Sequence, residues 1–173
     1  MAILEIVIAP DQVLKTVCDP VQDVDDNVRT LIRDMLDTMY KAPGIGLAAC
    51  QVGVTKRVIV VDVSDDKEEN QPYCMVNPEV TWESEEWSVY QEGCLSLPEQ
   101  YADVERPAAV KVSYLDENGT KQEIEADGLL ATCIQHEIDH LDGLLFVDHI
   151  SKLKRGMIMK KLKKIVAAKA ADS

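Results

Sequence analysis

The stretch QHEIDHLDG, residues 135–143, is the feature that most constrains how this chain can fold. Residues four apart lie on one face of a helix with Cβ atoms about 5 to 6 Å apart, so His136 and His140 face the same way. Glu137 lies beside them, which gives the HExxH pattern of helices that bind a metal ion and activate water. We therefore expect a helix here with a metal site on one face.

A structural role for the two histidines is the alternative, in which they pair with Asp139 or Asp142 on the helix. The residues 132–134 (TCI) that precede the motif favour a buried helix. Burial favours a metal site over surface ion pairs, because buried polar groups need partners.

The HExxH pattern leaves the third ligand open. A metzincin would require histidine at position 146, where this chain has Phe146. A thermolysin-like site would use a downstream glutamate, but residues 151–171 contain no acidic side chain. His149 follows the helix stop and is interpreted as a surface or helix-cap residue. The third ligand is therefore expected upstream of the motif.

Cys94, in the loop-like stretch QEGCLSLP (91–98), is the leading candidate. One thiolate and two imidazoles leave a coordination position open, which is typical of a catalytic site; a structural site fills all four with protein ligands. Spacing alone also allows Cys94 to be an ordinary buried thiol.

Apolar spacing predicts an amphipathic helix that starts at Asp25 and Asp26 and ends before Pro43 and Gly44. Its apolar positions are Val28, Leu31, Ile32, Met35, Leu36 and Met39. The expected strands are a buried RVIVVDV (57–63), the shorter YCMVN (73–77), EVTWES (79–84) and SVYQE (88–92), and a hairpin of VKVSYL (110–115) and KQEIEA (121–126) around Asn118-Gly119.

Two more helices follow these strands. Asp127 is expected to cap a helix over 128–141 that ends at Gly143. A final helix starts near Ser151 and places six apolar residues on one side: Leu153, Met157, Ile158, Leu162, Ile165 and Val166. The predicted fold class is α+β, with mostly antiparallel β-sheets around a central HExxH helix and a C-terminal helix.

Charged residues are distributed unevenly along the chain. The formal net charge is −13, yet residues 151–173 hold 8 of the 18 Lys and Arg and only 1 of the 31 Asp and Glu. Such a basic segment suits either a polyanion such as RNA or the acidic remainder of the chain, and the sequence favours neither.

The five cysteines indicate a reducing compartment, because their number is odd and no CxxC occurs. No apolar run approaches the roughly 18 residues of a membrane span, and no signal peptide is evident. We expect a cytoplasmic protein without a membrane partner.

Three motifs in order, GIGLAACQVG (44–53), EGCLS (92–96) and QHEIDH (135–140), resemble the signatures of the peptide deformylase family. The resemblance extends nearly end to end, through PDQVLKTV, DTMY, RVIVVDVS, VNPE and ADGLLATCIQHE. It implies one domain over residues 1–173, with a catalytic core (1–150) and a basic C-terminal helix (151–173).

The resemblance implies hydrolysis of the N-formyl group from the formylmethionine of nascent polypeptides, which releases formate. A metal-activated water is the implied nucleophile, Glu137 the general base and acid, and Gln51 with the N–H of Leu95 the oxyanion hole. The metal ligands are Cys94, His136 and His140.

Further site residues follow from the same resemblance. Ile45, Gly46 and Gly93 would pair with the substrate main chain, and an apolar face that includes Ile45, Leu129 and Cys133 would receive the methionine side chain. Apolar residues of this kind also suit an ordinary core.

The donor set fits zinc, iron, cobalt or nickel. From the resemblance we expect one Fe²⁺ per chain, replaceable by Ni²⁺, Co²⁺ or Zn²⁺. The expected protein is a monomer whose basic C-terminal helix contacts the ribosome.

Other positions are expected to support the site or to vary. Glu92 and Arg106 are expected to pair behind the second motif, and Cys50 to pack rather than react. Tyr101 stands where many bacterial family members have arginine. This difference bears on which substrate residues after the methionine are preferred at the mouth of the site.

Two rival functions fit the sequence less well. GIGLAA followed by Asp62 resembles a dinucleotide-binding fingerprint, but a helix precedes Gly44 where a strand is required. A non-catalytic ribosome-binding module with a structural metal would need neither Glu137 nor Gln51.

Overall fold

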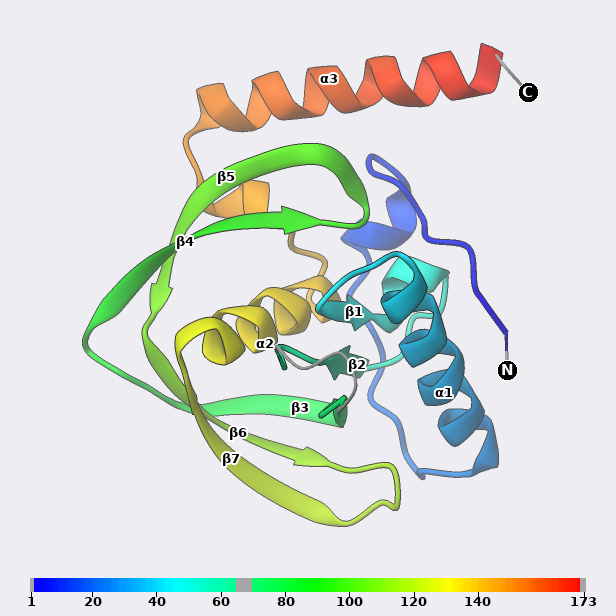
Figure 1. Cartoon of the computed structure of the whole chain (residues 1–173), viewed down its shortest axis with the longest axis vertical. Coiled ribbons are helices and arrows are strands. Elements are labelled where there is room, and N and C mark those ends of the chain that lie inside the picture. The colour runs from blue at the N-terminus through cyan, green and yellow to red at the C-terminus, as the bar shows by residue number, and fades with distance from the viewer. Residues whose placement is uncertain (1, 65–69, 172–173) are drawn as a thin grey trace.

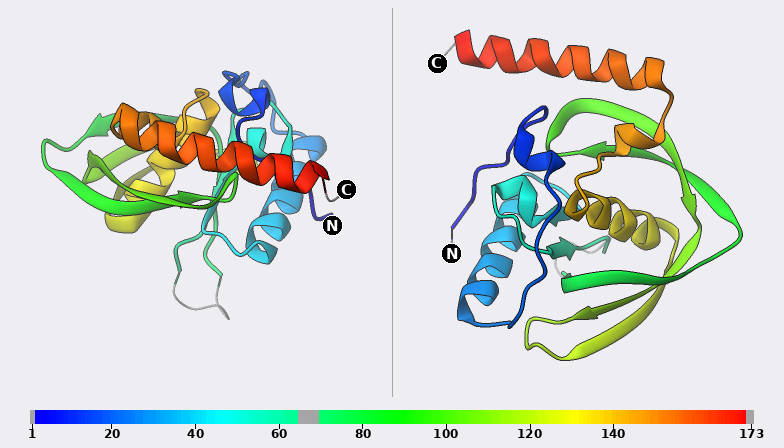
Figure 2. Two further views of the ribbon diagram at one scale, coloured as in Figure 1. Left: turned by 90° about the horizontal axis from the view of Figure 1, so that it is seen from above. Right: turned by 180° about the vertical axis from the view of Figure 1, so that it is seen from behind.

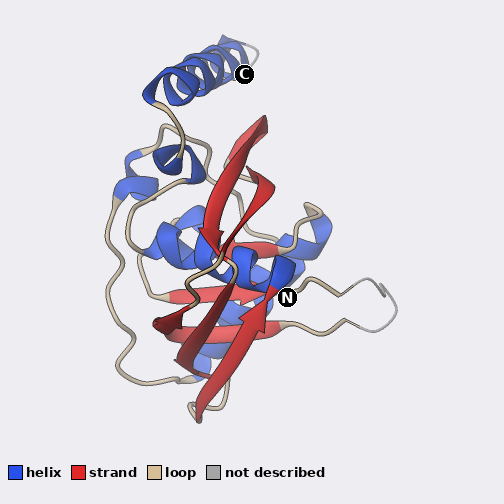
Figure 3. Ribbon diagram, turned by 90° about the vertical axis from the view of Figure 1, so that its left-hand side faces the viewer, coloured by secondary structure: helices blue, strands red, loops and turns tan. Residues whose placement is uncertain are grey.

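Helix α2 (Gly128–Leu141), which carries the HExxH motif, lies between two antiparallel β-sheets in the computed structural model, which describes residues 2–64 and 70–171 (Figure 1). The side view of Figure 3 shows strands on both sides of this central helix. The α+β fold class predicted from the sequence is confirmed.

The larger sheet has five strands in the order β1-β2-β3-β6-β7, and every neighbouring pair is antiparallel. Strands β4 and β5 form a separate two-stranded sheet on the other side of α2. The bounds are β1 Gly46–Ala48, β2 Val58–Val61, β3 Tyr73–Glu83, β4 Trp87–Cys94, β5 Leu97–Pro107, β6 Ala109–Leu115 and β7 Lys121–Asp127.

Strand β2 explains how two helices share one sheet. Val58 and Val60 pack with helix α1 (Asp26–Lys41), whereas Ile59 and Val61 pack with α2. A strand buried on both faces reads as a continuous apolar run rather than an alternating one, as VIVV does here.

Strand β3 joins two segments that were predicted separately. Its alternation breaks at Asn77, which has a positive φ of 52°, beside Pro78, and the register with β6 shifts between Val76 and Glu79. The Asn77 side chain also holds Val21 through two hydrogen bonds of 2.8 and 2.7 Å. A bulge therefore interrupts the pattern without ending the strand.

Strand β5 was not predicted, although it is as long as β3. Its sequence, LPEQYADVERP, contains two prolines and no run of alternating apolar residues. The pairing with β4, from Trp87 opposite Pro107 to Gly93 opposite Tyr101, creates this strand, so it is a tertiary effect.

The cap of α2 differs in detail from the prediction. Asp127 occupies the N-cap position, but its side chain makes no capping hydrogen bond. At the other end Gly143 has a φ of 78°, which suits the predicted helix stop.

Helix α3 (Lys152–Ala171) runs along one end of the molecule next to β5 and the short helix η3 (Phe146–His149) (Figure 2). Of its six predicted apolar-face residues, only Ile158 and Leu162 are buried. Leu153, Met157 and Val166 are exposed because the helix touches the body along a narrow line. Residues 172–173 of the expected basic segment lie outside the described residues.

The remaining short helices are η1 (Gln12–Lys15) and η2 (Ala49–Val52). Within residues 2–64 and 70–171, no helix is both long and apolar enough to cross a membrane.

Candidate metal centre

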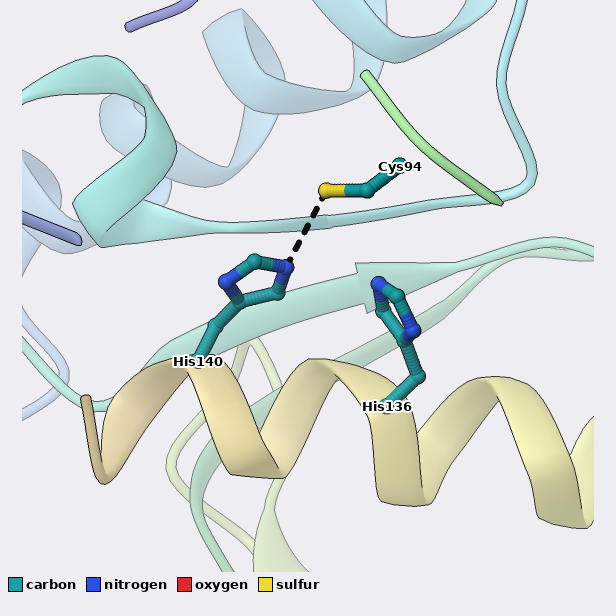
Figure 4. A group of neighbouring side chains, drawn as sticks. All are labelled: Cys94, His136 and His140. Carbon is teal, nitrogen blue, oxygen red and sulfur yellow. Dashed lines mark hydrogen bonds between the residues drawn. The ribbon is translucent and has the colours of Figure 1, made fainter. Parts of the chain in front are cut away.

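Cys94 and the two histidines of HExxH meet at the end of strand β4. His136 and His140 rise from α2 toward Cys94, which lies at the tip of the β4–β5 hairpin (Figure 4). One ligand atom from each residue lies within 4.8 Å of the others, and Cys94 Sγ is 3.3 Å from His140 Nε2. The structure thus brings together the three predicted ligands.

The hairpin tip places Cys94 above the helix. The β4–β5 register shifts between Gly93 and Cys94, so that Cys94 pairs with Leu97 across a tight turn. The turn is held from behind because Ala9 N–H donates to Ser96 C=O at 2.8 Å. Cys94 is partly buried as a residue, whereas His136 and His140 are buried.

Gln51 lies against the same sulfur. Its Nε2 is 3.4 Å from Cys94 Sγ and 3.2 Å from Ser96 Oγ, while its Oε1 accepts a 2.9 Å hydrogen bond from Ala48 N–H. These partners come from the first two of the three motifs, so the side-chain amide links β1 and η2 to the hairpin tip.

Glu137 lies beside the cluster and is 2% exposed. Burial is the main reason that the pKa of its carboxyl is raised to about 7, and nearby Glu92 adds to the effect. Its Oε2 and the Nδ1 of His140 are buried without a hydrogen-bond partner in the part of the chain that the structure describes. Since buried polar atoms are normally paired, the Oε2 of Glu137 beside the cluster indicates a site built around water or an ion. The Nδ1 of His140 is on the other side of its ring from Nε2, the atom nearest Cys94 Sγ.

The donor chemistry agrees with a metal ion. Burial is the main reason that the pKa of His140 is lowered well below its usual value, whereas hydrogen bonds with Cys94 and Glu92 outweigh burial and raise the pKa of His136. A thiol and two imidazoles suit zinc or iron, cobalt and nickel. The residues present therefore fit a bound metal.

Glu92 and Arg106 pair as the sequence predicted. Arg106 Nε and Nη2 donate to the two Glu92 oxygens at 2.7 and 3.0 Å, and both side chains are about 5% exposed. Glu92 Oε1 is also 2.9 Å from His136 Nδ1. Hydrogen bonds with His136 and Arg106 outweigh burial and lower the pKa of Glu92.

A cleft of about 310 Å³ opens next to the cluster. All five residues expected to bind substrate line it, and so do Gln51, Leu95 and Glu137. The five are Ile45, Gly46, Gly93, Leu129 and Cys133. Ile45 and Leu129 are 46% and 44% exposed, so they form a surface rather than the core.

An added Cβ would come very close to neighbouring side chains at two glycines of this cleft. A Cβ on Gly46 would lie 2.9 Å from Cys133 Sγ and 3.0 Å from Glu137 Cγ. A Cβ on Gly93 would lie 2.6 Å from the ring of Tyr101, which is 63% exposed at the mouth. The backbone therefore approaches both walls closely.

The dinucleotide-binding interpretation finds no support in these contacts. Asp62, the acidic residue of the dinucleotide hypothesis, accepts hydrogen bonds from Tyr40, Ser64 and Gln71. Residues 49–52 form only a short 3-10 helix rather than a crossover helix.

Cys50 is fully buried, and its thiol lies 3.4 Å from the carbonyl oxygen of His140. The neighbouring thiol of Cys18 and burial raise the pKa of Cys50, which agrees with a packing role.

Sequence reasoning missed part of the site's surroundings. His149 Nε2 lies 2.7 Å from Asp139 Oδ2, and Phe146 stacks on His136 with ring centroids 6.2 Å apart. No spacing rule connects η3 to α2 across Gly143, so only the folded chain shows these contacts.

The fold and the cluster define an α+β enzyme of the HExxH class whose third candidate ligand, Cys94, comes from an earlier strand. The polypeptide deformylase family model matches residues 3–156, and the chain belongs to this family.

Known peptide deformylases are similar to this chain over nearly its whole length. The peptide deformylase of Rhizobium meliloti (strain 1021) is 56% identical over 100% of this chain and 99% of its own. That of Phenylobacterium zucineum (strain HLK1) is 57% identical over 99% and 100%. The crystal structure of peptide deformylase from Ehrlichia chaffeensis in complex with actinonin is 43% identical, with a TM-score of 0.91 over 95% of this chain and 98% of that one.

Proposed function

We propose that this chain hydrolyses the N-formyl group from the N-terminal formylmethionine of nascent polypeptides and releases formate. The observation that carries this proposal is the cluster of Cys94, His136 and His140 with Glu137 and Gln51 at one cleft. A purely structural metal site would need neither of the last two side chains.

The proposed cofactor is one Fe²⁺ ion per chain, held by Cys94, His136 and His140 and replaceable by Ni²⁺, Co²⁺ or Zn²⁺. When bound, such an ion supplies Lewis acidity and lowers the pKa of a water molecule at the site toward about 7. The close approach of one ligand atom from each of these residues, within 4.8 Å of one another, supports this ligand set.

Glu137 is proposed as the general base and then the general acid. Its carboxylate would take a proton from the attacking water and deliver it to the leaving amine nitrogen. Support comes from its place on the wall of the cleft, one residue after His136, and from the unpaired Oε2.

Gln51 and the backbone N–H of Leu95 are proposed to stabilise the oxyanion that develops on the formyl oxygen. The Gln51 amide is suited to this role because Ala48 holds its oxygen and leaves its nitrogen beside Cys94. Leu95 follows Cys94 at the hairpin tip and lines the same cleft.

The substrate is proposed to lie as an added strand along Ile45, Gly46 and Gly93, with the methionine side chain against Ile45, Leu129 and Cys133. Main-chain pairing favours affinity without sequence preference, which suits an enzyme that acts on many nascent chains. The half-exposed Ile45 and Leu129 support an apolar subsite at this position.

The proposal also covers the division of the chain, its location and its partner. Residues 1–150 would form the catalytic core, and the basic helix of residues 151–173 a ribosome-binding segment. We further propose that the protein is a cytoplasmic monomer. The side chains of Lys160, Lys161, Lys163 and Lys164 are exposed, which supports a contact with a polyanion.

The decisive experiment measures formate release from formyl-Met-Ala-Ser by anaerobically purified protein. Glu137→Ala is the comparison, with metal content determined for both proteins. Turnover by the unaltered chain that is lost in the variant, at equal metal content, supports the reaction and the role of Glu137. Full metal occupancy without turnover in the unaltered chain contradicts the proposal.

A further inference from the structure

A continuous row of hydrogen bonds joins His136 to the surface of the protein. His136 Nδ1 contacts Glu92 at 2.9 Å, and Glu92 accepts both contacts from Arg106. Arg106 Nη1 then donates to Asp139 Oδ2 at 2.7 Å, and the same oxygen is 2.7 Å from His149 Nε2.

The inner members of this row have little freedom to move. Glu92 and Arg106 are 6% and 4% exposed. The planar guanidinium of Arg106 uses three of its nitrogens on two carboxylates, so its orientation is fixed by both of them at once. A change in the position of Asp139 therefore passes to Glu92 through a rigid group.

His149 occupies the outer end, where the side chain is about one-third exposed. It belongs to η3, the same short helix whose Phe146 stacks on the ring of His136. The single turn of η3 is thus connected to His136 in two ways. Phe146 contacts its ring directly, and His149 reaches it through the row of hydrogen bonds.

We propose that His149 is a positioning residue for the metal centre: by holding Asp139 Oδ2, it fixes Arg106 and Glu92 and through them the imidazole of His136. Groups that orient metal ligands from behind set ligand geometry and affinity. This inference rests on the metal site of the proposed function. It adds a residue that reaches His136 only through Asp139, Arg106 and Glu92.

The experiment compares His149→Leu, which removes the donor, with His149→Gln, whose amide nitrogen can replace Nε2. Arg155→Leu is the matched control, because it removes the 3.1 Å ion pair between Arg155 and Asp148 of the same η3 turn without touching the row. The readouts are the Kd for Co²⁺ by chelator competition, the absorption spectrum of the Co²⁺ form and thermal unfolding of the metal-free protein.

Groups in direct contact with a metal ligand typically change metal affinity about 10- to 100-fold, so for the more distant His149→Leu we expect a loss of about 3- to 10-fold. The Co²⁺ spectrum should change in shape, and His149→Gln should recover both affinity and spectrum. Combining His149→Leu with Asp139→Asn should cost no more than the larger single change, because His149 is proposed to act on the metal centre through Asp139.

A His149→Leu protein with unaltered Co²⁺ affinity and spectrum would overturn the inference, even if it melts earlier. Equal effects of Arg155→Leu on affinity would also overturn it, since loosening of η3 would then be the cause. Failure of the unaltered chain to bind Co²⁺ would remove the metal centre itself. Unaltered Co²⁺ binding and the expected variant pattern without formate release would instead leave the row intact and contradict the proposed reaction.

Discussion

The side-chain nitrogen of Gln51 lies 3.4 Å from the sulfur of Cys94. The amide has one defined orientation, because its oxygen accepts the Ala48 N–H at 2.9 Å. In a flipped amide the NH₂ group would face the Ala48 N–H, so that two hydrogen-bond donors would point at each other. The donor end of the amide therefore faces the cluster, although Gln51 itself is 1% exposed. A group held in this way needs little reorganisation when charge develops beside it.

Replacing Gln51 with leucine is expected to lower kcat for formyl-Met-Ala-Ser by about 10²- to 10³-fold, as is typical for loss of one oxyanion donor. Metal content and KM should change far less, because the amide is not in the proposed ligand set. Gln100→Leu is a matched control, since Gln100 is also buried and, within residues 2–64 and 70–171, its side chain hydrogen-bonds only to the Pro98 carbonyl. Equal losses in the two variants would count against an oxyanion role.

Gly46→Ala is expected to abolish most activity while the chain still folds. The new methyl group would lie about 3 Å from both Cys133 Sγ and Glu137 Cγ, so Glu137 must shift. Formate release and metal content should be measured together, with metal content retained. Gly156→Ala is the matched control: a Cβ there meets nothing within 4 Å, and alanine within α3 should stabilise the protein by about 1 kcal/mol. Normal turnover by Gly46→Ala would show that the cleft tolerates the displacement.

Asp62 is expected to make stability depend on pH. Burial alone would raise the pKa of this carboxyl, but hydrogen bonds from Ser64, Tyr40 and Gln71 outweigh it and lower the pKa below its usual value. A group with a depressed folded-state pKa stabilises the protein above its unfolded pKa of about 3.9, and this contribution is lost as the pH falls through the folded value.

Asp62→Asn should therefore lower the free energy of unfolding by about 2 kcal/mol near neutral pH. This difference should stay constant down to about pH 5 and shrink over the acidic range below that, as the pH falls through the unfolded pKa of about 3.9 and the lower folded value. Denaturant unfolding at several pH values measures this. Exposed Asp23→Asn serves as the control. A difference that stays constant over this range would mean that the carboxylate charge is not what stabilises this junction of α1 and β2.

Elements with a regular period could be predicted from the sequence. Helix α1, the β6–β7 hairpin and α2 follow patterns that local residues determine, and the HExxH spacing placed His136 and His140 on one helix face. Strand β5 was missed because proline and charged residues hide a strand that exists only through its pairing with β4. Local rules do not include such a partner.

The candidate site also has a part that the sequence predicted and a part that only the folded chain shows. Position in a motif identified Cys94 and Gln51 as candidates, but the contact between them depends on how the hairpin tip folds over α2. The link from His149 to Asp139 joins two helical segments across a turn and carries no periodic signal. Side chains that act through another residue are therefore the part of a site that sequence reasoning detects least.

The basic helix α3 gives a final prediction, which separates charge from packing. Lys160→Glu with Lys164→Glu reverses two exposed charges, while Leu162→Ala removes a fully buried contact with the body. If α3 binds the ribosome, the double lysine variant should bind more weakly, and the slope of log K against log salt should fall by about 0.7 to 0.9 per lost phosphate contact.

Leu162→Ala should instead lower the free energy of unfolding by about 2 to 5 kcal/mol and leave the salt slope unchanged. Sedimentation with purified ribosomes at several salt concentrations, beside denaturant unfolding, measures both effects. Formate release from formyl-Met-Ala-Ser should stay normal in the lysine variant, because the described residues that line the cleft all lie outside α3. If ribosome binding is the same in the double lysine variant, the basic side chains of α3 do not bind the ribosome. Their interaction with the acidic body of the protein would then be the better explanation.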